Sequence, residues 1–359
     1  MDITMNKIRE SNFELLRIFA IVGVVVLHSS SYFFQSYENN GLFWNILFHI
    51  LHAIFIPSVN VFLIITGYFM CNKNSVSVKK PILLYIQNTI FFIGLYVVSL
   101  IKADKIFSIK SMVFRFLPSS WFLVIYIVLF LIIPFINIGI VYLKKKYFKL
   151  FLGVCLFFFS FYATGIDIIQ SFMTRIQING GGELIGYSPI GQKGSQEGYT
   201  IVNFVLMYLC GGYIRKTDLE LKSKYCLLFI LINTFLIFLW IKFDYTVGEE
   251  YCNPLVILNA ILIFLYFKNM KIQSKIINKF AAACFTVYIF HIPLLFRIPK
   301  DFCYGRKLLA IPKYCLIVIG IYGICWFVHE IYNATVNRFL DKMIFVRHDF
   351  IISNGLDRG

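Results

Sequence analysis

The first long apolar stretch of the chain is Asn12–Ser31, with the sequence NFELLRIFAIVGVVVLHSSS. About 20 residues of this character are enough for an α-helix to cross the hydrocarbon core of a bilayer. The stretch nevertheless contains Glu14, Arg17 and His28. An ionisable side chain in hydrocarbon costs about 2.5–3.5 kcal/mol on insertion scales, so such residues indicate a function or a specific partner. The stretch therefore predicts a transmembrane helix that carries part of a site.

Similar apolar stretches recur along the whole chain, separated by short polar segments. We count about ten of them, at approximately 13–34, 44–70, 81–101, 119–142, 150–170, 199–214, 225–244, 254–267, 281–299 and 312–335. Those near 199 and 254 are short, at about 15 residues against the roughly 20 that a full crossing needs. We therefore expect an all-α fold, that of a polytopic transmembrane protein of about ten helices.

Composition supports a membrane protein and excludes two other classes. Hydrophobic residues make up 59% of the 359 residues, charged residues make up 14%, and the mean hydropathy is +0.76. A water-soluble domain of this size could not bury so much apolar surface. The net charge of +16 does not indicate a nucleic-acid partner. The basic residues lie in the short segments between apolar stretches, where membrane topology accounts for them.

The distribution of basic residues predicts the orientation in the membrane. An even number of spans puts both termini on one side. If that side is the cytoplasm, the cytoplasmic loops are 71–80, 144–149, 215–224 and 268–279. About 22 of the 34 Lys and Arg residues then lie inside, in line with the positive-inside rule. We expect one transmembrane domain over residues 1–335, a cytoplasmic tail over 336–359, and a multi-pass location in a bacterial cytoplasmic membrane.

Arg17 and His28 are eleven residues apart, which puts them on nearly the same face of a helix, about 16 Å apart along its axis. Glu14 is one turn before Arg17 and in reach of it. Each residue has a structural interpretation, since arginine can snorkel to lipid headgroups and a buried histidine can bond a neighbouring helix. Because Arg17 and His28 lie together on one helix face, a functional site is the favoured interpretation. A guanidinium suits an anionic ligand, and an imidazole suits proton abstraction from a hydroxyl group near neutral pH.

Other histidines are less informative. His291 follows Tyr288 by three residues and precedes Pro293, an arrangement that is more often structural than functional. His49 and His52 share that spacing, have no carboxylate beside them in the sequence, and are predicted to lie at the membrane interface. We therefore predict no metal site.

Six segments of this sequence form a recognisable series. They are Arg17-x10-His28 within Asn12–Ser30, Ser58–Phe69 ending in Thr-Gly-Tyr-Phe, Ser120-Trp-Phe-Leu123 followed by Tyr126 and by Pro134–Asn137, Tyr208-Leu-Cys-Gly-Gly-Tyr-Ile-Arg-Lys216, Tyr251-Cys-Asn-Pro-Leu255, and Phe285–His291. The series resembles, in order, the motifs of the acyltransferase-3 family of integral membrane O-acyltransferases. The similarity covers residues from about 12 to 293.

The resemblance implies that an acyl group, usually acetyl from acetyl-CoA, is moved to an extracytoplasmic sugar hydroxyl. The expected acceptor is a cell-surface or lipid-linked glycan. On this view, Arg17 holds the anionic part of the donor and contributes to catalysis, and His28 is the general base. An acyl-histidine intermediate remains an alternative. Aromatic rings, amides and an imidazole suit a sugar, and we expect the outer cavity to be lined by Tyr68, Trp121, Tyr251, Asn253 and His291.

Two other functions compete with acyl transfer. A transporter or flippase for a lipid-linked glycan would have polar residues along its whole pathway and internal repeats. The sequence has neither, because its ionisable residues concentrate in the first, second and ninth stretches. A non-catalytic membrane subunit would account for the aromatic content, but it has no use for Arg17 and His28 on one face. The oligomeric state is left open by the sequence.

Overall fold

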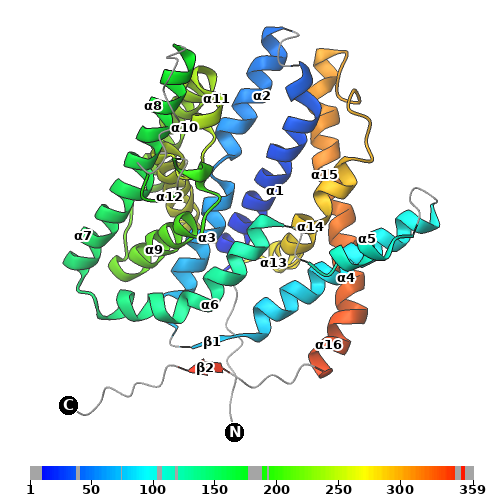
Figure 1. Ribbon diagram of the computed structural model, residues 1–359, viewed down its shortest axis with the longest axis horizontal. Helices are drawn as coiled ribbons and strands as arrows, with labels where there is room; N and C mark the ends of the chain where they lie inside the picture. Colours follow the sequence, from blue (N-terminus) through cyan, green and yellow to red (C-terminus); the bar gives the residue numbers. More distant parts are fainter. Residues whose placement is uncertain are drawn as a thin grey trace.

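The computed structural model describes residues 10–37, 41–73, 75–102, 107–117, 120–176, 188–191, 194–343 and 349–351. Within this part of the chain the fold is helical, apart from two three-residue strands (Figure 1). In chain order the elements are α1 (Ser11–Phe34), η1 (Gln35–Tyr37), α2 (Leu42–Phe55), α3 (Ser58–Met70), β1 (Ser75–Ser77), α4 (Lys79–Ile101), α5 (Ile109–Phe114), α6 (Trp121–Tyr142), α7 (Lys145–Leu156), η2 (Phe157–Tyr162), α8 (Ala163–Arg175), η3 (Gln196–Gly198), α9 (Ile201–Thr217), α10 (Ser223–Phe243), α11 (Tyr245–Gly248), α12 (Pro254–Lys268), α13 (Lys275–Ala281), α14 (Cys284–Leu295), α15 (Lys307–Tyr332), η4 (Asn333–Asn337), α16 (Arg338–Met343) and β2 (Asp349–Ile351).

The predicted multi-pass helical architecture is confirmed. Among the described residues, 7 helices are long and apolar enough to cross a membrane, or up to 8 if the bent pair α13–α14 is one span. All ten apolar stretches are helical, but the number of full-length spans is smaller than the ten expected. The helices α9 and α12, at 17 and 15 residues, are shorter than the roughly 20 residues that a complete crossing usually takes. These are the two stretches that the sequence marked as short.

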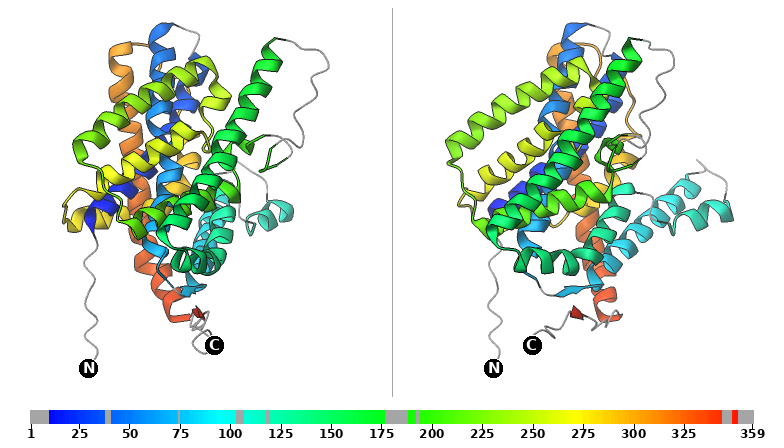
Figure 2. Two further views of the ribbon diagram at one scale, coloured as in Figure 1. Left: turned by 90° about the vertical axis from the view of Figure 1, so that its left-hand side faces the viewer. Right: turned by 60° about the vertical axis from the view of Figure 1, so that its left-hand side comes forward.

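Segments that the sequence assigns to one side of the membrane lie together at one end of the bundle. Hydrogen bonds join them: Asn12 Nδ2 to Phe267 O (3.1 Å), Lys268 Nζ to Asp218 Oδ1 (2.9 Å), Asn137 Nδ2 to Lys73 O (2.8 Å) and Lys216 Nζ to Val141 O (3.0 Å). The strand pair and α16 lie at the lower end in Figures 1 and 2, and α1 begins in the lower half of the bundle. That this end faces the cytoplasm stays a prediction.

The C-terminal segment is more than an unattached tail. The helix α15 continues through the π-helix η4 into α16, which ends at Met343. Further on, β2 pairs antiparallel with β1, with Ile351 opposite Ser75. The end of the described chain is thereby held against the segment between α3 and α4.

The helices α3 and α9 approach each other closely in the core. A Cβ atom placed on Gly67 would lie 2.1 Å from the carbonyl oxygen of Tyr208, and one on Gly211 would lie 2.2 Å from that of Ile64. Only glycine allows the two backbones to approach so closely, as in other membrane helix pairs. The Tyr208 hydroxyl also donates to Asn137 Oδ1 (2.7 Å), which ties the pair to α6. These contacts fix α3, one wall of the cavity described next.

Candidate active site

A cavity of about 930 Å³ lies between α1, α3, α4, α6, α14 and α15. Its wall on α1 is a single helix face, formed by Glu14, Arg17, Ile21, Val24 and His28. The cavity therefore runs along α1 from its first turns to His28, in the second half of the helix. Its volume is in the range of sites for drug-sized ligands and cofactors, about 300–1,000 Å³.

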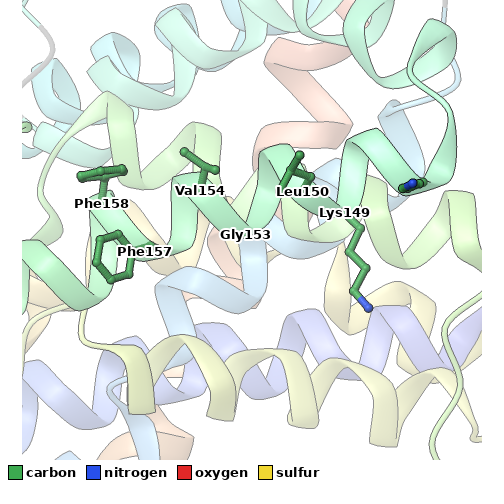
Figure 3. A pocket seen from close by; sticks show the side chains of 7 residues that line it. Lys149, Leu150, Gly153, Val154, Phe157 and Phe158 are labelled. Carbon is green, nitrogen blue, oxygen red and sulfur yellow. The ribbon is translucent and has the colours of Figure 1, made fainter.

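A second hollow, of about 470 Å³, lies on the outer surface of α7 and η2 (Figure 3). It is lined by Leu150, Gly153, Val154, Phe157 and Phe158, together with two lysines near its end. Leu150 and Phe157 are exposed on this face of a candidate membrane span. Apart from the two lysines, the lining is apolar, which fits contact with lipid chains.

Arg17 and His28 occupy the places on α1 that their spacing predicts. The Arg17 Nη1 atom lies 3.0 Å from Glu14 Oε1, as expected for an i,i+3 pair, and this side chain is 41% exposed at one end of the cavity. The His28 side chain is exposed into the cavity. The residues that flank His28, Leu27 and Ser29, are buried. The imidazole is thus presented to any molecule that enters.

His291 lies beside His28, with the two ring centroids 5.1 Å apart. The His291 Nδ1 atom is 3.0 Å from the carbonyl oxygen of Val287. A carbonyl can only accept, so Nδ1 carries a hydrogen, and in the neutral ring Nε2 then has the lone pair. His291 is 2% exposed, and its Nε2 atom has no partner among the described residues. The pair therefore combines an accessible imidazole with one whose orientation is fixed.

Aromatic side chains form another part of the cavity wall. The rings of Trp121 and Tyr251 stack with their centroids 6.0 Å apart, and Tyr199 packs edge-on against Trp121 at 4.4 Å. Tyr288 also lines the cavity, and its hydroxyl shares a hydrogen bond with that of Ser120. The structure therefore brings Trp121 and Tyr251 into one cavity with the histidines, although they come from distant parts of the sequence.

The structure does not bring Tyr68 and Asn253 into this cavity. The Tyr68 hydroxyl accepts from Arg215 Nη1 (3.0 Å), and its ring lies against Phe13 with the centroids 5.5 Å apart. Asn253 caps α12: its Oδ1 accepts from the Leu255 N–H (2.9 Å), and its Nδ2 donates to a backbone carbonyl (3.1 Å). Both side chains therefore make hydrogen bonds within the fold instead of lining the cavity.

The sequence analysis did not predict the partner of one polar group near the site. His52 is buried, and its Nδ1 atom hydrogen-bonds the carboxylate of Glu249. Its expected position at the membrane interface stays a prediction. Its Nε2 atom lies 3.3 Å from the Ser31 hydroxyl, one turn beyond His28 on α1. Glu249 is 197 residues away in the chain, so spacing gave no signal for this contact.

Glu250, next to Tyr251 and outside the membrane-spanning helices, belongs to a buried acidic group. Burial and the neighbouring Asp167 carboxylate raise the pKa of Glu250 to about 10. The Ser195 hydroxyl and the Glu197 carboxylate also lie close to it. Glu250 is therefore protonated at neutral pH and can donate a hydrogen bond to Asp167.

The wall formed by α4 and α15 carries polar groups that the sequence analysis did not select. Asn88, His329 and Asn333 line it. Asn333 belongs to the π-helix η4, a feature that is frequent at functional sites. Among the described residues, no group of three or more His, Cys, Asp or Glu side chains is placed to hold a metal ion.

Comparison with known families agrees with this geometry. The family model described as "Acyltransferase domain", that of the acyltransferase-3 family, matches residues 10–330. The chain belongs to this family, and it is a multi-pass membrane acyltransferase. No curated protein and no solved structure matches it significantly.

Proposed function

We propose that this protein is an O-acyltransferase that moves an acetyl group from acetyl-CoA to a sugar hydroxyl of a cell-surface or lipid-linked glycan. The observation that carries the proposal is the exposed His28 imidazole, which lies in a closed-in cavity beside His291 and on the same helix face as Arg17. Donor and acceptor meet at the two histidines.

His28 acts as the general base. The sugar hydroxyl attacks the thioester carbonyl carbon and transfers its proton to His28. The C–S bond then breaks, and the leaving thiolate takes the proton, which yields the sugar ester and free thiol. The His291 ring lies beside that of His28, with the centroids 5.1 Å apart. In this mechanism its Nε2 lone pair accepts a hydrogen bond from the imidazolium that forms on His28, because an oriented acceptor lowers the free energy of a developing positive charge. Both residues therefore serve one proton transfer.

Arg17 binds the anionic end of the donor. Its distance from His28 along α1, about 16 Å, is comparable to the length of an extended pantetheine arm. The ion pair with Glu14 fixes the guanidinium at the cavity mouth while leaving donors free for phosphate oxygens. A donor held at both ends has its thioester positioned for attack.

Trp121 and Tyr251 bind the acceptor. Flat aromatic faces suit the apolar faces of a sugar ring. The Tyr288 hydroxyl, which hydrogen-bonds Ser120 directly before Trp121, bonds a sugar hydroxyl. The acceptor enters from the outer half of the cavity, where these rings lie, and the donor enters from the Arg17 end.

The proposal is tested with the purified protein in proteoliposomes that contain the native lipid-linked glycan. Labelled acetyl from acetyl-CoA should appear in the glycan, in equal amount to the free CoA thiol released. Release of thiol without labelled glycan would show hydrolysis. Movement of unmodified glycan between leaflets without incorporation of label would instead support the transporter alternative and refute acyl transfer.

A further inference from the structure

Asn88 on α4 has a buried side-chain amide that makes no hydrogen bond to the described residues. It is 0% exposed and lines the cavity, and neither its Nδ2 nor its Oδ1 atom has a partner among the described residues. Buried amides are almost always hydrogen-bonded, because an unpaired one retains the full cost of losing its water contacts. An orphan amide on the wall of a cavity indicates a ligand that supplies the missing bonds.

The neighbouring polar groups are occupied with one another. Gln87 Nε2 donates to Thr286 Oγ1 (3.2 Å), Thr286 shares a hydrogen bond with His329 Nδ1 (3.1 Å), and Asn333 Nδ2 lies 2.8 Å from His329 Nε2. This chain fixes α4 against α14 and α15, and it holds the backbone that carries Asn88. None of its members reaches the Asn88 amide.

We propose that the Asn88 side chain binds an amide of the pantetheine arm of the acyl donor. A secondary amide offers one N–H donor and one C=O acceptor, which complements the two unpaired atoms of Asn88. The rest of this wall includes Leu84 and Phe92, which suit the methylene groups on either side of such an amide. The inference rests on the proposed function and deepens it.

The position of Asn88 selects the amide farther from the sulfur. Thr286, which contacts the residue before Asn88, precedes His291 on α14 by about 7.5 Å at about 1.5 Å per residue. In an extended pantetheine arm, the two amide nitrogens follow the thioester sulfur at about 4 and 9 Å. With the thioester at His28 and His291, the second amide comes nearest to Asn88.

The experiment compares three acetyl donors with wild type and with Asn88→Leu, a substitution of similar volume. Acetyl-CoA and S-acetyl-pantetheine have both amides, whereas S-acetyl-N-acetylcysteamine has only the first. Asn88→Leu should raise the KM of the first two donors about 10- to 100-fold and leave that of the short donor unchanged. The melting temperature of the free protein should stay the same or rise, because the variant no longer buries an unpaired amide.

Thr89→Val is the matched control. The wild-type Thr89 side chain also lies on α4, and its buried Oγ1 atom has no hydrogen-bond partner among the described residues. Thr89 is not part of the cavity wall. This variant should keep the wild-type KM for all three donors. If Asn88→Leu does not accumulate in membranes, Asn88→Ala is measured in the same way.

Two results would overturn the assignment while leaving the proposed function intact. One is an active Asn88 variant with wild-type KM for acetyl-CoA, or with an equal rise for the short donor. The other is a rise confined to the KM of the glycan, which would place the amide in the acceptor site. Failure of wild type to transfer acetyl from any donor would instead refute the proposed function itself.

Discussion

Replacing Glu250 by Gln should make the stability of the protein less sensitive to alkaline pH. The folded-state pKa of Glu250 is about 10, compared with 4.5 for the free side chain, because the carboxyl is buried beside Asp167. Between these values the folded protein holds a proton that the unfolded chain has released. The contribution of Glu250 to the free energy of unfolding is therefore fully present below about pH 4.5. It is lost as the pH rises toward 10, at about 1.4 kcal/mol per pH unit.

Between pH 6 and pH 8.5, the free energy of unfolding should fall by about 3.4 kcal/mol because of this group. Glu250 is only 4% exposed, so solvent screens the interaction little. Glutamine keeps the shape and a donor toward Asp167 but does not ionise.

The assay is thermal unfolding in detergent, followed by intrinsic fluorescence, from pH 6 to pH 8.5. The melting temperature of wild type should fall more steeply with pH than that of Glu250→Gln. Glu220→Gln, at an exposed carboxylate, should behave like wild type. Parallel slopes for Glu250→Gln and wild type would refute the claim that Glu250 is held protonated.

Three further predictions concern the packing of the core and the two ends of the cavity. Gly67→Ala should destabilise the protein by about 1–3 kcal/mol, because the new methyl group meets the Tyr208 backbone. Gly94→Ala, which has open space around it, should leave the stability unchanged. Thermal unfolding of both variants tests this difference. Arg17→Gln should raise the KM of acetyl-CoA about 10-fold or more but leave that of S-acetyl-pantetheine, which has no phosphates, near wild type; equal effects on both donors would contradict a phosphate contact. Trp121→Ala should raise the KM of the glycan about 10-fold with little change for the donor, and a rise confined to the donor would contradict an acceptor site at this ring.

The sequence could predict what depends on a single helix. Hydropathy identifies the spans, and a period of 3.6 residues is enough to put Arg17 and His28 on one face. The shortness of α9 and α12 was also readable from the sequence. In the described part of the chain, seven helices, or eight with the bent pair, are long enough for a full crossing, and the two short stretches are marked as such by the sequence.

Contacts between helices could not be predicted in this way. The partners of His52 and of Asn88's neighbours lie on other elements, and a single sequence does not show which helices pack together. Tyr68 was assigned to the cavity although it faces Arg215. Asn253 is different, since an Asn followed by Pro254 is a readable helix-start signal, and its role as a cap was available from the sequence.

The most direct test of the central claim is transfer of labelled acetyl from acetyl-CoA into the glycan by wild type, His28→Ala and His49→Gln. His49 is a buried histidine that does not line the cavity, so His49→Gln controls for loss of an imidazole elsewhere. A general base contributes about 10²–10⁴-fold to a rate. The rate of acetyl transfer by His28→Ala should therefore fall by that factor at unchanged stability in detergent, while His49→Gln should stay active. A His28→Ala protein with wild-type turnover would contradict this prediction.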